Sequence, residues 1–225
     1  DVQEAFEDSF LAFNYADRYQ CPVVVLLDKY LASSYLTAPA FDETGLAVDR
    51  GLRFDPARRN GPYKRYAFTP DGLSPRSHPG QEGGIFWTSG DEHDEVGHIQ
   101  EQALNRTKMM KKRMGKLQLA EREIPAERAV RRYGPERADA TILGWGSTKG
   151  AILDALEVLR AEGVSVNFIQ VRLMSPFPTQ RVRELLRDAK KVIAVEQNFS
   201  GQLSRLVQEF AAIEIPRRVV KFDGR

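Results

Sequence analysis

The sequence predicts an α/β protein in three parts: a short helix-and-strand segment, an irregular arm, and a domain built on a parallel sheet. A helical pattern precedes a short apolar run within the first 40 residues. Prolines and glycines then crowd residues 37–100, and from residue 139 onward strand and helix patterns alternate. Because strands that alternate with helices form parallel sheets with right-handed crossovers, the last part sets the fold class.

The composition is that of an ordinary globular protein. Of the 225 residues, 42% are hydrophobic and 28% are charged, and the formal net charge is only +2. We therefore expect no nucleic-acid partner, and no membrane partner either, since the longest apolar run, residues 23–27, is too short to cross a bilayer. The single cysteine, Cys21, excludes an internal disulfide, a zinc ribbon and an iron–sulfur cluster held by this chain alone, and it predicts a cytoplasmic setting.

The first segment reads as a helix followed by a buried strand. Residues 3–19 repeat apolar side chains at helical spacing and begin with acidic ones. Residues 23–27 are continuously aliphatic, which is typical of a parallel strand covered on both faces. Asp28 would then lie at the carboxyl end of that strand, where it either caps the turn at residues 30–35 or faces a ligand.

The middle of the chain is expected to be an ordered arm without long helices. Residues 37–100 hold half of the 12 prolines, yet they keep too many aromatic side chains for a disordered linker. Residues 101–123 return to helical spacing, with a basic face around an apolar stripe. We expect the apolar stripe to pack against the rest of the protein and the basic face to be solvated. The alternative is a nucleic-acid or calmodulin-type surface. The stripe comprises Leu104, Met110, Met114 and Leu117.

The last part gives the most regular pattern. Gly163 follows one helical stretch in the position typical of a helix end. Expected strands are residues 140–143, 164–171, 192–195 and 219–222, and expected helices are residues 149–162, 179–188 and 201–210.

Two loops of this domain should meet at the carboxyl edge of its sheet. Residues 144–150, Gly-Trp-Gly-Ser-Thr-Lys-Gly, join a strand to a helix, and residues 196–201 do the same further on. Ser147 or Thr148 either caps the first helix or helps bind an anion, although the spacing matches neither a dinucleotide fingerprint nor a P-loop. Ser200 is a candidate cap for the second helix.

The densest chemical cluster is Gly-Asp-Glu-His-Asp-Glu-Val-Gly-His at residues 90–98. Its four carboxylates and two histidines match no metal-ligand spacing, so no metal ligands are assigned. A solvated loop, a metal site and a preorganised loop facing a neighbouring subunit's active site all remain open. No Ser/His/Asp nucleophile motif is present.

Several segments together resemble one enzyme family. These are Asp-Gly-Leu-Ser-Pro-Arg at 71–76, the 90–98 cluster, Asn-Arg-Thr-Lys-Met at 105–109, the 144–150 turn, Ser-Pro-Phe-Pro at 175–178, and Val-Glu-Gln-Asn-Phe-Ser-Gly at 195–201. In this order they resemble the α subunit of 2-oxoacid:ferredoxin oxidoreductases, closest to its 2-oxoglutarate-type branch.

The resemblance implies a thiamine diphosphate enzyme that decarboxylates a 2-oxoacid, transfers the acyl group to coenzyme A and reduces ferredoxin. Residues 1–38 would be the end of a pyrimidine-binding thiamine module, residues 39–124 a connecting arm with a basic helix, and residues 125–225 a domain like the C-terminal domain of transketolase. A β subunit would carry the diphosphate-binding module, magnesium and the iron–sulfur cluster, leaving no cofactor on this chain alone.

The resemblance also limits the site. The chain opens without Met inside a helical pattern, so we expect a piece of a longer polypeptide that shows no turnover by itself. The family's Tyr-Pro-x-Thr-Pro segment and its activating carboxylate would lie upstream of Asp1. The expected contributions of this chain are a substrate-mouth rim of Asp91, His93 and Asp94, and groups facing a substrate carboxylate or phosphate, namely Arg76, Ser147 and Thr148.

Two other functions fit parts of the chain. Another thiamine enzyme, such as a transketolase or a pyruvate dehydrogenase β chain, would share the last domain but not the segments at 71–76 and 90–98. A non-catalytic module would use the last domain for dimer contacts or the 144–150 turn for a nucleotide.

Overall fold

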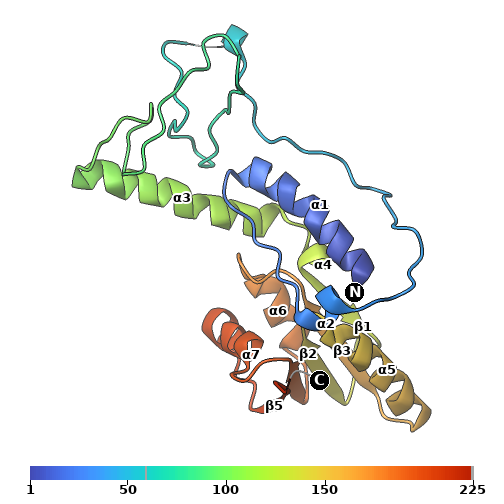
Figure 1. The fold of residues 1–225 in the computed structure, drawn as a ribbon. Helices are drawn as coiled ribbons and strands as arrows, with labels where there is room; N and C mark the ends of the chain where they lie inside the picture. The colour runs from blue at the N-terminus through green and yellow to red at the C-terminus, as the bar shows by residue number, and fades with distance from the viewer. Residues whose placement is uncertain (59, 224–225) are drawn as a thin grey trace. The chain divides into compact units, whose positions relative to one another are not determined.

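The computed structural model describes residues 1–58 and 60–223, which divide into two compact units (Figure 1). The sheet unit comprises Asp1–Ala5, Leu26–Ala40 and Glu123–Arg225, and the arm unit comprises Phe6–Val25 and Phe41–Arg122. Helix α1, Val2–Tyr19, gives its first turn to the sheet unit and the rest to the arm unit. No helix in the described part of the chain has the length and apolarity that crossing a membrane requires.

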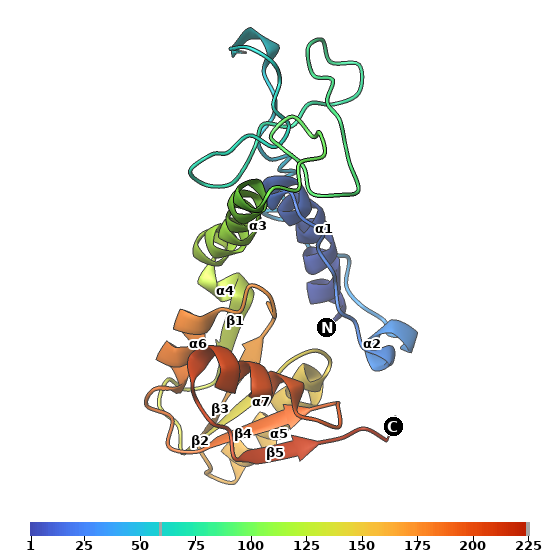
Figure 2. The ribbon, with the colours of Figure 1, turned by 90° about the vertical axis from the view of Figure 1, so that its left-hand side faces the viewer.

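The sheet unit is built on five strands in the order β1-β3-β2-β4-β5. Four of them pair in parallel, and β1 pairs with β3 antiparallel at one edge. Figure 2 shows helix α5 on one face of the sheet and helix α7 on the other. The strands are β1 (Val130–Tyr133), β2 (Ala140–Gly144), β3 (Val166–Val171), β4 (Val192–Glu196) and β5 (Arg217–Val220).

Helices follow the parallel strands as the alternation predicts, so the α/β class with a mostly parallel sheet is confirmed. Gly163 adopts a φ of +79° just after α5, the left-handed conformation that only glycine enters freely. The core between the layers includes Leu143, Ile169, Val182 and Leu203. The helices are α4 (Ala126–Ala129), α5 (Thr148–Ala161), α6 (Thr179–Leu186) and α7 (Gln202–Leu206), which a π-helical turn extends over Val207–Ala211.

The prediction of a strand at residues 23–27 is wrong. These five side chains are between 37% and 77% exposed and form no strand. An aliphatic run becomes a buried strand only when neighbouring strands satisfy its backbone groups, and no described residue pairs with this one. The segment leads instead into a short helix, α2 (Lys29–Ser33), which Asp28 caps by accepting a hydrogen bond from Leu31 N.

The arm unit has little regular structure besides its two helices, as expected for its composition. The described residues of the arm between them form a 3-10 turn, Pro56–Arg58, and isolated bridges such as Arg53 to Arg76. Side chains replace strand ladders as the connection to helix α3 (Ala103–Glu123): the Asn105 amide donates to two loop carbonyls, one of them His93 O at 2.9 Å.

The expected packing of α3 is wrong. Leu104, Met110 and Met114 are exposed, whereas Met109 and Ala120 are the fully buried side chains of the helix. The face around Met109 also carries Lys112 and Lys116, so part of the supposedly solvated basic face is half-buried. Lys112 and Lys116 can be half-buried on this face because backbone carbonyl oxygens of the arm unit accept hydrogen bonds from both ammonium groups.

Candidate functional site

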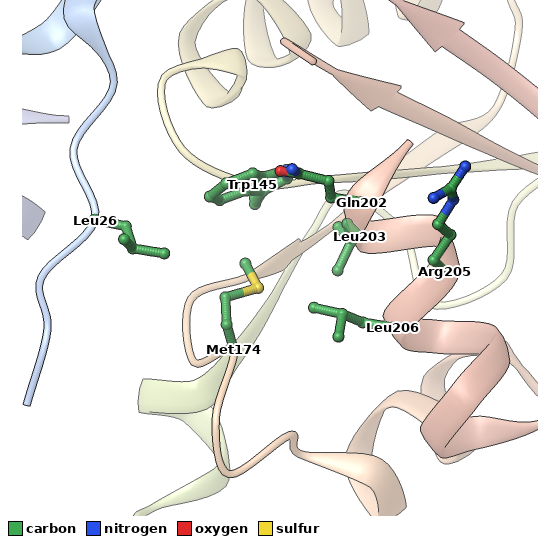
Figure 3. A pocket seen from close by; sticks show the side chains of 7 residues that line it. All are labelled: Leu26, Trp145, Met174, Gln202, Leu203, Arg205 and Leu206. Atoms are coloured by element: carbon green, nitrogen blue, oxygen red, sulfur yellow. The ribbon is translucent and has the colours of Figure 1, made fainter. Parts of the chain in front are cut away.

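The carboxyl ends of three parallel strands converge on a pocket in the sheet unit. Its residues follow β2 (Trp145), β3 (Met174) and β4 (Gln202, Leu203, Arg205 and Leu206), and Leu26 completes it (Figure 3). The pocket holds about 330 Å³. Open α/β sheets bind ligands at this edge, where loops from neighbouring strands diverge. The lining is apolar apart from Gln202 and Arg205.

A buried carboxylate organises this edge. Glu196, 1% exposed at the end of β4, accepts hydrogen bonds from Leu203 N at 2.8 Å and from both the backbone and the hydroxyl of Ser204. The Trp145 indole donates to it at 3.4 Å and the Asn198 amide at 2.8 Å. Burial raises the pKa of Glu196, but these donors outweigh it and hold the pKa below its ordinary value. Glu196 therefore fixes both the start of α7 and a wall of the pocket.

A carboxylate of the chain itself occupies the start of α5. Asp28 Oδ2 accepts from Ser147 N at 3.0 Å, while its other oxygen caps α2. Gly146, with a φ of +62°, lets this oxygen approach closely. Of the two candidate anion-binding residues, Ser147 contacts the Asp28 carboxylate, and its hydroxyl also lies 3.2 Å from Gln197 Oε1, whereas the Thr148 hydroxyl donates to Trp145 O at 2.7 Å. Neither side chain caps α5.

The cap expected at Ser200 is supplied by Asn198. Its side-chain oxygen accepts from Gly201 N at 2.7 Å and from Gln202 N at 3.1 Å. The helix thus begins on an asparagine and a glutamate rather than on the serine, because both acceptors precede the turn and reach its free amides.

Removing the Asp28 carboxylate should loosen two helix starts at once. We expect Asp28→Ala to lower the free energy of unfolding of the sheet unit by about 2 kcal/mol, because two amides lose a charged acceptor. Urea titration in a Trp87→Phe background leaves Trp145 as the only tryptophan to report on this unit. Asp154→Ala, at an exposed position of α5, is the control; equal effects of the two substitutions would contradict the dual cap.

The predicted rim residues lie in the arm unit. Asp94 Oδ1 accepts from the backbone amides of Val96, Gly97 and His98, each at 3.0 Å, so this carboxylate shapes the loop. The His93 ring lies 4.1 Å from the Tyr66 ring, and its Nδ1 is 3.2 Å from Asp91 O. These bonds preorganise residues 90–98.

Arg76 has a carboxylate partner within the chain. One of its terminal nitrogens donates to Asp17, which Arg50 also contacts at 3.5 Å. The hydrogen bond from Arg76 is the main reason why the pKa of Asp17 lies below its ordinary value. Arg76, expected to face a substrate carboxylate or phosphate, thus contacts one oxygen of a carboxylate of its own chain.

The pocket residues and Glu196 were not assigned functions from the sequence. The signal for Glu196 was its place at the end of an apolar strand directly before a helix start, where a carboxylate is either buried with donors or solvated. Only the fold shows which, since its indole donor lies 51 residues earlier in the chain.

Two family models match the chain. Residues 1–112 match "Pyruvate flavodoxin/ferredoxin oxidoreductase, thiamine diP-bdg", and residues 138–224 match "Pyruvate:ferredoxin oxidoreductase core domain II". The second match covers the sheet from β2 onward.

Similar proteins span the whole chain. The α subunit of 2-oxoacid:ferredoxin oxidoreductase 1 from Aeropyrum pernix is 40% identical over 100% of this chain and 35% of its own length. The 2-oxoglutarate synthase subunit KorA from Methanothermobacter marburgensis is 28% identical over 94% of this chain and 54% of its own length.

A solved structure agrees. The 2-oxoglutarate:ferredoxin oxidoreductase from Magnetococcus marinus, with 2-oxoglutarate, coenzyme A and succinyl-CoA bound, is 33% identical and superposes with a TM-score of 0.84 over 94% of this chain and 36% of that one. The chain thus spans about a third of the length of the Aeropyrum relative. By sequence and by fold, it belongs to the 2-oxoacid:ferredoxin oxidoreductase family, among the α subunits.

Proposed function

We propose that this chain forms part of an enzyme that oxidatively decarboxylates a 2-oxoacid to an acyl-CoA and passes the electrons to ferredoxin. The observation that carries the proposal is the match to a 2-oxoglutarate:ferredoxin oxidoreductase over 94% of the chain at a TM-score of 0.84. Subunit names among the relatives support a partner subunit. Activity would require that partner and further polypeptide, because the chain spans only 35% of the Aeropyrum relative.

2-Oxoglutarate is the substrate we propose. The solved relative holds 2-oxoglutarate and succinyl-CoA, and KorA is named for the same substrate. The Aeropyrum relative carries the broader name, so pyruvate is the competing substrate that an assay has to include.

The side chains available as metal ligands suggest which subunit would hold each cofactor. The match of residues 1–112 to a thiamine diphosphate-binding model supports that cofactor in the complex, and the solved relative supports coenzyme A. Within residues 1–58 and 60–223, no three His, Cys, Asp or Glu side chains lie together in a way that could hold a metal ion, and the chain has one cysteine. One cysteine cannot supply the thiolates of an iron–sulfur cluster, and we assign the cluster and magnesium to the β subunit.

Within this proposal the loop at residues 90–98 borders the substrate mouth. Asp94 is committed to three backbone amides and sets the loop's shape, whereas His93 keeps its ring at the surface of the loop against Tyr66. Of the three predicted rim residues, we assign His93 to meet a substrate carboxylate, because Asp91 and Asp94 would repel one. Arg76 would stabilise the arm unit through its hydrogen bond to Asp17 rather than bind substrate.

The proposal is tested with the complete enzyme, assembled from the full α subunit and its β subunit. We expect viologen or ferredoxin reduction that depends on coenzyme A and is faster with 2-oxoglutarate than with pyruvate. His93→Asn should lower kcat/KM for the 2-oxoacid about tenfold, while His98→Asn on the same loop changes it less than twofold. Reduction by the 225-residue chain alone would refute the division of parts, and equal rates for both substrates would refute the substrate assignment.

A further inference from the structure

Three cationic side chains meet in the arm unit and form no ion pair with a carboxylate among the residues that the structure describes. They are Arg65 from the irregular arm and Lys112 and Lys116 from successive turns of α3, and we call them the cationic cluster. All three are half-buried, so each keeps part of its surface open to solvent. Like charges four residues apart on a helix repel each other, and burial adds to that cost.

Neutral groups connect the cluster. Gln20 accepts from Lys116 at its backbone oxygen (2.6 Å) and from Arg65 at its side-chain oxygen (3.1 Å). Lys112 donates to the Ser74 hydroxyl at 2.7 Å and to the Gly72 carbonyl, and the Gln20 amide donates to the Ser74 carbonyl. Gln20 and Ser74 therefore bring the three cations to one place, but they bring no negative charge.

The nearby carboxylates are engaged elsewhere. Asp71 accepts from Leu73 N at 3.0 Å, and Glu95 pairs with Lys64 at 2.8 Å and accepts from a backbone amide. Glu92 pairs with Arg113. Each of these carboxylates has a donor of its own, and none of the three forms an ion pair with the cluster; Asp71 and Glu95 attract the charge of Lys112 only from a distance.

The ionisation of the lysines reflects this imbalance. Burial, followed by repulsion from Lys116 and Arg65, lowers the pKa of Lys112 from 10.5 to about 8, although Asp71 and Glu95 pull it upward. Burial also lowers the pKa of Lys116, and the charge of Arg65 adds to the effect, whereas Cys21 opposes it. A bound anion would relieve the repulsion.

We propose that the cationic cluster of Arg65, Lys112 and Lys116 binds a phosphate group. Three positive charges match a doubly charged oxyanion better than a single carboxylate, and ammonium groups bind phosphate as compact point charges while a guanidinium adds directed donors. The inference does not depend on the proposed function, because it rests on the contacts within the arm unit alone.

The test measures phosphate binding to the full chain at constant ionic strength in chloride. With lysines labelled at Cε, inorganic phosphate should shift the Lys112 and Lys116 NMR signals and raise the pKa of Lys112 from about 8 toward its ordinary value. Lys116→Gln should weaken binding about tenfold. Lys111→Gln, an exposed lysine of the same helix, should change it less than twofold.

Two results would contradict phosphate binding at the cationic cluster. Lysine signals that do not respond to phosphate, or equal weakening by Lys116→Gln and Lys111→Gln, would overturn the proposal. Because the wild-type titration needs no variant, misfolding of Lys116→Gln leaves the test intact. Coenzyme A and thiamine diphosphate form the second arm: tighter binding than inorganic phosphate assigns the group to a coenzyme, and equal or weaker binding assigns it to free phosphate.

Discussion

Replacing Glu196 by alanine should lower the free energy of unfolding of the sheet unit by about 3–5 kcal/mol, the largest single effect that the structure predicts. The carboxylate is 1% exposed and serves five donors. Alanine would leave the buried donors of Leu203 and Ser204 without an acceptor, would release the half-buried Trp145 and Asn198 groups, and would open a void beside Leu203. The cost of the unmet donors dominates, because each would otherwise be bonded to water in the unfolded chain.

Glu196→Gln gives a graded comparison. The amide keeps the size of the side chain and one acceptor oxygen, but its NH2 group faces donors such as Leu203 N and the Asn198 amide. We expect a loss of about 2–3 kcal/mol, smaller than for alanine.

Urea unfolding followed by Trp145 fluorescence in the Trp87→Phe background measures both effects. Glu214→Ala, at an exposed position of the same unit, is the control and should fall within about 0.5 kcal/mol of the parent. If Glu196→Ala cost no more than Glu214→Ala, the carboxylate would have no organising role at the pocket.

The sheet unit shows which parts of a fold the sequence predicts. Residues from 139 onward carry alternation of strand and helix patterns, and the observed elements follow it because each strand finds its neighbours within the same stretch. Strand β1 was not predicted, because Val-Arg-Arg-Tyr has two charged residues at its centre and no alternating apolar pattern. It becomes a strand by pairing with β3. Residues 23–27 show the reverse case, a strand pattern without a pairing partner.

The site was less predictable for a related reason. The expectation that the 144–150 turn would hold either a cap or an anion was chemically sound, but the anion present there is Asp28, which lies 119 residues from Ser147. Similarly, the helical spacing of α3 locates a basic stripe without telling which face the arm covers. Local patterns give the kind of group a position can hold, and only long-range packing selects its partner.

A second large effect is expected at the buried ion pair of Glu4 and Lys149. Lys149 Nζ lies 3.0 Å from Glu4 Oε1, both side chains are largely buried, and the Gln170 amide donates to the other Glu4 oxygen at 3.1 Å. The Lys149 ammonium also lies 5.5 Å from the centre of the Tyr133 ring. Lys149 also pairs with the half-exposed Asp1, and Glu4 also contacts the N-terminal amine at 3.1 Å and Arg131 and Arg172 at 3.9 Å. Removing either charge leaves the other with partners that are more exposed or more distant, so Glu4→Gln and Lys149→Met should each cost about 2–3 kcal/mol.

The pair also predicts an acid-dependent loss of stability. Burial raises the pKa of Glu4, but the hydrogen bonds from Lys149 and Gln170 and the charge of Arg172 outweigh it and lower the pKa to about 2. The unfolded chain titrates near 4.3, so the native state binds fewer protons between these values. The stabilisation is complete above the unfolded pKa and is lost as the pH falls through about 2.

The difference in unfolding free energy between the parent and Glu4→Gln should therefore shrink by about 2–3 kcal/mol between pH 6 and pH 2. Glu209→Gln, at an exposed position, should show no such dependence. A double-mutant cycle adds the decisive comparison: Glu4→Gln combined with Lys149→Met should cost less than the sum of the single changes, because the attraction between the two groups is then lost once and not twice. Additive costs would mean that the two groups stabilise the unit independently, and the low pKa of Glu4 would then come from its other partners, Gln170 and Arg172.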